Sequence, residues 1–320
     1  MKQLALGIDL GGTGTKFGLV NSEGKVLRSN AIPTPQYPDI DEYCDVLCAG
    51  MKQLVSDEGL SMADIIGIGC GAPNGNFYTG CIEQAPNLPW KGVVPLAKMI
   101  SERMGIPCTV TNDANAAAQG EMIYGSARGM KNFIVITLGT GVGSGIVIDG
   151  KVLYGHDGFA GELGHCKVDY SGNGRQCGCG QRGCIEAYAS ATGVARTAKE
   201  IIATSTQPTL LRNVADIDHI TSKDVFDAAE QGDAVAKQIF DYTGRLLGQK
   251  LADYVHFSSP EAIILFGGLT KSGHWIMDPI REALNENLLS IWKGKIPVTI
   301  STLKDSDAAI LGAASLAYEQ

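Results

Sequence analysis

Two similar stretches of the chain constrain its fold more than any other feature. The segment from Ile8, IDLGGTGTKFGLVNSEGKVL, is similar to the segment from Ile136, ITLGTGVGSGIVIDGKVLYG. In each, an apolar strand, a Gly/Thr turn, a second apolar strand and a polar turn lead to Gly-Lys-Val-Leu. The repeat predicts two lobes built alike, each offering a glycine-rich turn to a ligand. The alternative is that glycine-rich hairpins recur by chance in unrelated sheets.

Both turns are suited to phosphate. Because glycine has no Cβ, an anion can approach the backbone N–H groups of such a turn closely. The 41 glycines gather in short runs after apolar segments, which indicates close approach to a ligand rather than disorder. The pattern G-x4-G-K-[ST] does not occur, so the turns are not P-loops.

Strands alternate with helices between the two hairpins, which predicts an α/β fold. Apolar residues recur at helical spacing over 39–57, and strands are expected at 65–70 and 107–111. The second of these strands ends on Asn112-Asp113, and an alanine-rich helix follows. Open α/β sheets bind ligands at such strand ends. From the sequence alone, Asp113 fits the role of a general base and the role of a helix N-cap equally well.

The second half of the chain is expected to be mostly helical. Helices are predicted from residue 186 to about 203, over 224–230 behind a Thr221/Asp224 capping box, over 234–257, from about 275, and over 308–318. A strand at 262–266 delivers Gly267-Gly268, and another is expected at 297–301.

The stretch Ala160 to Glu186 has the spacing of a metal site. His165 precedes Cys177, Cys179 and Cys184, and three thiolates with one imidazole fill the tetrahedron of a structural Zn²⁺. The glycine-rich loop between them has too few apolar residues to bury a core of its own. Unrelated free thiols are the alternative. Glu162 and Glu186 bracket the site as acceptors for hydroxyl groups or as solvated surface carboxylates.

Composition limits the partners and the compartment. The net charge of −8 and the lack of a Lys/Arg patch argue against nucleic acid or an anionic membrane. Nine cysteines and no signal-peptide pattern in MKQLALGIDL favour the reducing cytoplasm. No stretch has the run of about 18 to 20 apolar residues that spans a membrane.

The motifs together resemble those of the ROK sugar kinases, and among them the bacterial glucokinases. They occur in the family's order over nearly the whole chain. They are Asp9-Leu-Gly-Gly, Asn112-Asp113-Ala-Asn, Gly161-Glu162-Leu-Gly-His165, Cys177-Gly-Cys179 with Gly183-Cys184-Ile-Glu186, and Phe266-Gly-Gly268.

The resemblance implies an actin/hexokinase-like, ribonuclease H-like fold of two α/β lobes around a cleft for ATP and a sugar. Residues 1–118 with about 303–320 are expected to form the smaller lobe. Residues 119–302, with the zinc-binding loop 165–184, are expected to form the larger one.

The resemblance also implies roles for individual residues. Asp113 is the expected general base for the 6-hydroxyl of glucose, and Mg²⁺ is expected to accompany ATP near Asp9, for which a turn cap is the alternative. Hydrogen bonds to the sugar are expected from Asn87, Asn112, Asp113, Glu162, His165 and Glu186. Nucleotide contacts are expected from Asp9, Gly11, Gly12, Thr13, Lys16, Thr140, Gly141, Gly267 and Gly268.

One departure from the family's pattern concerns Lys16. The family commonly has Gly-Gly-Thr-Lys, whereas Gly14 and Thr15 intervene here, which leaves open whether Lys16 reaches a phosphate.

Several substrates and one other class of function stay open at this point. The rival substrates are N-acetylmannosamine, N-acetylglucosamine, fructose, mannose and allose. The family also includes sugar-responsive regulators with a helix-turn-helix region ahead of the kinase-like part. The first strand is expected from Lys2, so no such region is expected here. A sugar-binding protein without catalysis is a further alternative. The resemblance implies a homodimer or homotetramer.

Overall fold

The computed structural model describes residues 4–304 and 307–318. The contacts within it divide the chain into two compact units, each discontinuous in sequence. Unit 1 consists of Met1–Val135, Gly145–Gly161 and Ser301–Gln320, and unit 2 of Ile136–Ser144 and Glu162–Ile300. The lobe boundaries expected from the sequence, at 118/119 and 302/303, stay a prediction.

The first sheet has five strands in the order β3-β2-β1-β4-β7. The predicted hairpin is β1 (Leu4–Leu10) with β2 (Thr15–Asn21), and a third antiparallel strand that was not predicted, β3 (Val26–Ile32), pairs with β2. Two strands parallel to β1 complete it, β4 (Ile65–Gly71) and β7 (Cys108–Thr111). The carboxyl ends of β1, β4 and β7 therefore meet at one edge of the sheet.

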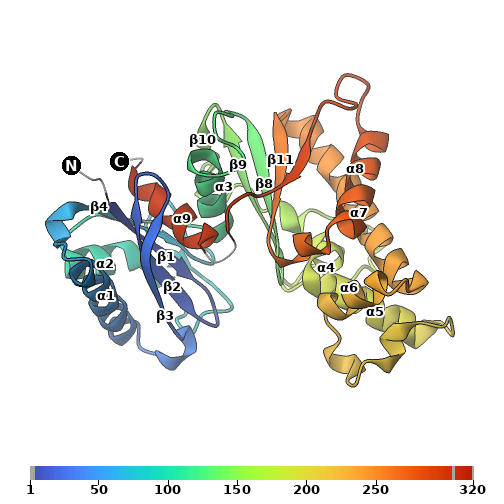
Figure 1. Ribbon diagram of the computed structural model, residues 1–320, viewed down its shortest axis with the longest axis horizontal. Coiled ribbons are helices and arrows are strands. Elements are labelled where there is room, and N and C mark those ends of the chain that lie inside the picture. The colour runs from blue at the N-terminus through green and yellow to red at the C-terminus, as the bar shows by residue number, and fades with distance from the viewer. Residues whose placement is uncertain (1–3, 305–306, 319–320) are drawn as a thin grey trace. The chain divides into compact units, whose positions relative to one another are not determined.

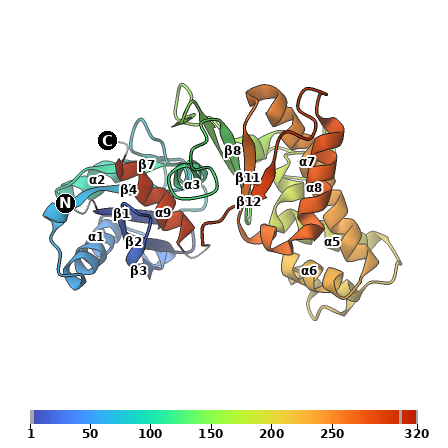
Figure 2. The same cartoon turned by 45° about the horizontal axis from the view of Figure 1, so that its top comes forward.

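Helices cover both faces of this sheet (Figures 1 and 2). Alternate residues of β1 point to opposite faces, so Leu6 and Ile8 pack in a core with α1 (Ile40–Asp57) and α2 (Leu96–Met104). On the other face Ala5 packs with α9 (Ala308–Ser315), which also contacts α3 (Asp113–Ile123). A short ribbon of β5 (Ile82–Glu83) and β6 (Val93–Val94) belongs to the same unit.

The second sheet repeats the order of the first, as β10-β9-β8-β11-β12. Its strands are β8 (Phe133–Leu138), β9 (Val142–Ile148), β10 (Lys151–Val152), β11 (Ala262–Phe266) and β12 (Val298–Ile300). The strands β8 to β10 correspond to β1 to β3. The duplication seen in the sequence is therefore a duplication of the sheet, and the α/β prediction is confirmed.

The helices of the second half are α4 (Glu186–Ala189), α5 (Ala191–Thr204), α6 (Ser222–Glu230), α7 (Ala234–Ser258) and α8 (His274–Asn287). Short 3-10 turns join them, at 210–213, 217–219 and 268–272. The capping box of Thr221 and Asp224 is present. Among the described residues, no helix is both long enough and apolar enough to cross a membrane.

One predicted helix is two. The sequence suggested a single helix from Glu186, but Ser190 has extended backbone angles and separates α4 from α5. Its hydroxyl accepts a hydrogen bond from the Gly193 N–H at 3.0 Å, so it caps the second helix.

Candidate functional site

Two carboxylates of unit 1 lie where the parallel strands end. Asp9 is the next-to-last residue of β1, level with Gly71 of β4, which is level with Thr111 at the end of β7. Asp113 follows Thr111 by two residues and opens α3. Asn112 is the N-cap of that helix, and its Oδ1 accepts a hydrogen bond from the Ala114 N–H at 2.8 Å. The N-cap role that Asp113 could have had therefore belongs mainly to Asn112.

Asp113 combines exposure with a raised pKa. Its side chain is exposed, yet protein atoms surround the carboxylate on most other sides and displace the water that would solvate it. This desolvation raises the pKa of Asp113, and hydrogen bonds from the backbone of Ala114 and of Asp113 itself oppose the rise. A carboxylate of this kind is a stronger proton acceptor than one free in water.

Asp9 and Lys16 form the rest of this electrostatic group. Desolvation by burial raises the pKa of Asp9 to about 6, with the charge of Asp113 adding to the rise and that of Lys16 opposing it. Lys16 lies directly opposite Asp9 in the antiparallel pair of β1 and β2 and is exposed. The charge of Lys16 therefore acts on the Asp9 carboxylate despite the two extra residues in the turn.

Hydrogen bonds within its backbone and from a buried threonine stabilise the first glycine turn, residues 11–14. The Gly11 N–H donates to the Gly14 carbonyl at 3.0 Å, and the Thr34 hydroxyl donates to the Gly11 carbonyl at 2.7 Å. Thr34 in turn contacts the Thr15 hydroxyl at 3.0 Å, and Thr15 contacts the Tyr43 hydroxyl at 2.8 Å. Sequence reasoning missed this buried network because its members lie far apart in the chain and match no motif.

Asn87 lies against this turn. A Cβ built on Gly12 would be 2.6 Å from the Asn87 carbonyl oxygen, so only glycine fits there. Asn87 and Thr13 are both exposed. The structure thus places a residue expected to bind sugar next to a turn expected to bind nucleotide.

The second glycine turn, in unit 2, has its own supports. The Gly139 N–H donates to the Gly141 carbonyl at 3.1 Å. The start of α5 holds the turn, because the Ala191 N–H donates to the Gly139 carbonyl at 2.9 Å and the Thr192 hydroxyl donates to the Thr140 carbonyl at 2.8 Å. Because α5 begins at Ala191, directly after the break at Ser190, both donors lie in its first turn beside the glycine turn.

Gly267 and Gly268 follow β11. Gly267 has φ 110°, and a Cβ on it would lie 2.6 Å from the Leu138 carbonyl oxygen at the end of β8. The ends of β8 and β11 therefore meet at a backbone contact that only glycine allows. Gly268 has open space around it.

The carboxylate of Glu186 links the second glycine turn, residues 139–141, to the cysteine loop. Its Oε2 accepts a hydrogen bond from the Val142 N–H at 3.0 Å, and its Oε1 lies 3.3 Å from Cys177 Sγ. Glu186 is therefore not a solvated surface carboxylate. Glu162 is exposed, with its Oε2 3.8 Å from His165 Nε2.

Four side chains of the loop converge as a metal-ligand set. One potential ligand atom from each of His165, Cys177, Cys179 and Cys184 lies within 4.8 Å of all the others. Cys179 Sγ and Cys184 Sγ are 3.8 Å apart, and Cys177 Sγ is 3.7 Å from His165 Nδ1. His165 thus turns Nδ1 to the thiols and Nε2 to Glu162.

These distances fit a tetrahedral zinc ion. Zn–S bonds of about 2.3 Å and Zn–N bonds of about 2.0 to 2.1 Å separate tetrahedral sulfur ligands by about 3.8 Å, and sulfur from nitrogen by about 3.6 Å. Burial raises the pKa of Cys177 and of Cys184, so both thiols are protonated until a cation displaces their protons. Cys166, next to His165, is outside the set.

The loop is also fastened by an arginine that sequence reasoning missed. Arg175 is only 9% exposed, and its guanidinium donates to the carbonyls of Ala187 at 3.1 Å and Gly193 at 3.3 Å. It also stacks on the Tyr188 ring, 4.6 Å from the centroid. Arg175 therefore ties the middle of the loop to α4 and α5.

Residues 5–320 match the family model described as "ROK family". The chain belongs to the ROK family. A glucokinase from Halalkalibacterium halodurans is 36% identical over 98% of this chain and 95% of that protein. A xylose repressor from Caldicellulosiruptor bescii is 28% identical over 96% of this chain and 76% of the repressor.

The solved structures of the ROK family include a close neighbour. A ROK family glucokinase from Streptomyces griseus, in complex with glucose and AMPPNP, superposes with a TM-score of 0.81 at 36% identity. The match covers 99% of this chain and all of the other. This likeness confirms the actin/hexokinase-like fold that the sequence predicts.

Proposed function

We propose that this ROK protein is an ATP-dependent glucokinase that phosphorylates the 6-hydroxyl of glucose. The observation that carries the proposal is the exposed Asp113 carboxylate at the end of a parallel strand, with its pKa raised. Its charge acts on Asp9, which lies opposite Lys16 in the pair of β1 and β2. Two relatives support the proposal. The chain is 36% identical to a glucokinase, and 36% identical to a glucokinase whose structure was solved with glucose and AMPPNP.

In the proposed reaction Asp113 is the general base. It takes the proton from O6 of glucose as O6 attacks the γ-phosphorus of ATP. The bond from O6 to phosphorus forms, the bond from phosphorus to the bridging oxygen breaks, and ADP leaves with that electron pair. Positioning supplies much of the rate, which is why Asp113 stands on a rigid helix start rather than on a loop.

The other residues have binding roles in this proposal. Sugar hydroxyls are bound by Asn87, Asn112, Glu162, His165 and Glu186. The backbones of the two glycine turns and of Gly267-Gly268 hold the nucleotide. Mg²⁺ bound with ATP neutralises phosphate charge, and Asp9, ionised above about pH 6, would hold it through water.

Zinc has a structural role in this proposal. The four ligands close the tetrahedron, so no position is open for catalysis. The ion would fix the loop and, through Nδ1, the aim of His165. With zinc on Nδ1 the proton would lie on Nε2, which faces Glu162, and the partly exposed imidazole could donate from Nε2 to a sugar oxygen.

A coupled assay of ADP release with Mg-ATP tests the proposal. We expect glucose to be preferred over N-acetylmannosamine, N-acetylglucosamine, fructose, mannose and allose. We expect Asp113→Asn to lower kcat by about 10² to 10⁴, the usual size of a lost general base. The control is Asp57→Asn, at an exposed position on α1.

Two results would contradict the proposal. Near-normal kcat in folded Asp113→Asn would remove Asp113 as the base. No turnover with any sugar, from folded and zinc-loaded protein, would favour a sugar-binding regulator like the repressor relatives. A homodimer or homotetramer in the cytoplasm stays part of the proposal, and light scattering during gel filtration measures the assembly.

A further inference from the structure

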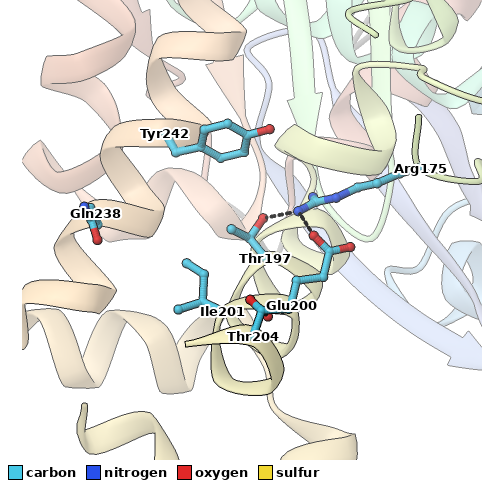
Figure 3. Close-up of a pocket in the computed structure, with 7 residues that line it drawn as sticks. All are labelled: Arg175, Thr197, Glu200, Ile201, Thr204, Gln238 and Tyr242. Carbon is cyan, nitrogen blue, oxygen red and sulfur yellow. Dashed lines mark hydrogen bonds and ion pairs between the residues drawn. The ribbon is translucent and has the colours of Figure 1, made fainter. Parts of the chain in front are cut away.

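Unit 2 has a pocket away from the residues assigned above. It has a volume of about 390 Å³, within the range of small-molecule sites. Figure 3 shows its walls, which come from α5, from α7 and from Arg175 of the cysteine loop. The lining residues are Arg175, Thr197, Glu200, Ile201, Thr204, Gln238 and Tyr242.

The buried end of the pocket carries a guanidinium group. Arg175 Nη2 donates to Glu200 Oε2 at 2.6 Å and to the Thr197 hydroxyl at 2.9 Å. Its other amino group, Nη1, is held by backbone carbonyls. The guanidinium is therefore fixed in place, with one edge turned to Glu200.

Arg175 shares its carboxylate partner with a second arginine. Arg196 Nε donates to Glu200 Oε1 at 3.0 Å, so two guanidinium groups share the single carboxylate of Glu200. The nearby Asp169 carboxylate accepts from the Ser171 N–H at 2.9 Å and the Tyr188 hydroxyl at 3.3 Å, and it does not line the pocket. Arg196 therefore offers Glu200 an alternative cationic partner when Glu200 leaves Arg175.

Glu200 is the more solvent-accessible partner of the Arg175–Glu200 ion pair. Its side chain is 46% exposed, whereas that of Arg175 is 9% exposed. Rotation toward solvent would leave Glu200 paired with Arg196 and open the edge of Arg175 to another oxyanion. A charge-assisted bond to the buried guanidinium is stronger than a bond to a neutral donor.

Two polar groups on α7 are free to bind the rest of a ligand. Within the described residues, no hydrogen bond joins the side chain of Gln238 or of Tyr242 to the protein, and the two residues lie one turn apart on the same helix face. Partial burial raises the pKa of the Tyr242 hydroxyl, so the hydroxyl keeps its proton and can donate. The amide of Gln238 can both donate and accept.

We propose that this pocket binds a small metabolite in which a phosphate or carboxylate group is attached to a hydroxyl-bearing body. The oxyanion binds Arg175 in place of Glu200, and the hydroxyl groups bind Tyr242 and Gln238. Binding here does not require that the chain be a kinase. It adds a second ligand site to unit 2.

Calorimetric titration of the full chain, saturated with glucose, Mg²⁺ and AMPPNP, tests this. The probes are gluconate, glycerol 3-phosphate and the neutral polyol sorbitol. We expect saturable binding of at least one anion and none of sorbitol, and the two anions distinguish carboxylate from phosphate. Glu200→Gln removes the carboxylate that competes for Arg175 and should tighten anion binding by about threefold to tenfold. Gln238→Trp places an indole ring in the mouth of the pocket and should abolish anion binding.

Matched variants outside the pocket serve as controls. Gln249→Trp places the same bulk at another exposed position of α7, and Glu282→Gln removes an exposed carboxylate from α8. Both should bind like the unaltered chain. Absence of saturable anion binding in the millimolar range, equal binding of sorbitol, or equal behaviour of Gln238→Trp and Gln249→Trp would overturn the proposal.

Discussion

Gly267 and Gly268 are neighbours in the chain with different constraints on a side chain. Gly267 has φ 110° and no room for a Cβ beside Leu138, whereas Gly268 has open space. We expect Gly267→Ala to lower the free energy of unfolding by about 1 to 3 kcal/mol or more. Gly268→Ala should change it by less than about 0.5 kcal/mol. Denaturant midpoints of the two variants measure this, and equal midpoints would contradict it.

Asp9 should reduce stability at neutral pH. Its folded pKa of about 6 exceeds the ordinary 3.8, so the folded state binds the proton more tightly than the unfolded state does. Stability from this group is therefore present below about pH 4 and is lost as the pH rises through 6. We expect Asp9→Asn to raise Tm at pH 7.5, with the gain vanishing near pH 4.

Asp64 provides a control of the opposite sign. Hydrogen bonds from the Ser61 N–H and hydroxyl, both at 2.8 Å, lower the pKa of Asp64. Asp64→Asn should therefore lower Tm at pH 7.5 and lose its effect as the pH falls through the folded pKa. A gain for Asp9→Asn that is the same at every pH would show that charge is not its cause.

At the scale of single residues, local chemistry was predictable and long-range coupling was not. The metal-ligand set follows from the spacing of its residues, because His165 and the cysteines lie within one loop. The effect of Asp113 on Asp9 depends on the pairing of β1 with β4 and of β4 with β7, which no local pattern encodes.

The elements follow the sequence where a repeating pattern extends over several turns. Helix α1 begins one residue after Asp39, whose side chain accepts hydrogen bonds from two N–H groups, and its apolar stripe is buried. Strand β3 was missed because VLRSNAI is mostly exposed and has no alternating apolar pattern. The end of α4 was missed because a serine can lie inside a helix as well as cap one.

The cysteine loop has little secondary structure to hold it. Two isolated bridges, Lys167 with Cys184 and Gln176 with Arg182, and one 3-10 turn are its regular elements in the described chain. We expect Cys184→Ser to lose bound zinc, from about one equivalent per chain, and to become sensitive to proteases within the loop. The KM for glucose should rise because His165 loses its orientation.

Metal analysis and limited proteolysis measure these changes. Cys81→Ser is the control, because Cys81 is buried in unit 1 and lies outside the metal-ligand set found among the described residues. Retention of full zinc occupancy by Cys184→Ser would contradict the assignment of the ligands.

At the scale of the whole molecule, the same sheet order occurs twice, and each sheet presents a glycine turn beside strand ends. This much was predictable, because the two hairpins have similar sequences. The residues that complete unit 1 were harder to foresee, because α9 returns from the far end of the chain to pack on β1 and β4.

That packing leaves no space at Gly69. A Cβ there would lie 1.8 Å from the Ala313 carbonyl oxygen of α9, whereas a Cβ on Gly67, two residues earlier on the same face, would lie 3.3 Å from the Ala317 Cβ. We expect Gly69→Ala to destabilise unit 1 by about 1 to 3 kcal/mol or more, and Gly67→Ala by clearly less. Hydrogen exchange of α9 measures the difference, and equal protection in both variants would contradict it.

The place of α9 in the chain also sets an order for synthesis. A ribosome delivers the strands of the first sheet early, but the helix that covers one of its faces comes only after all of unit 2. Until then Ala5, Val20 and the glycines of β1 and β4 face solvent or a chaperone. All segments of unit 2 are synthesised before the last segment of unit 1. Unit 1 is therefore the first to begin and the last to be completed.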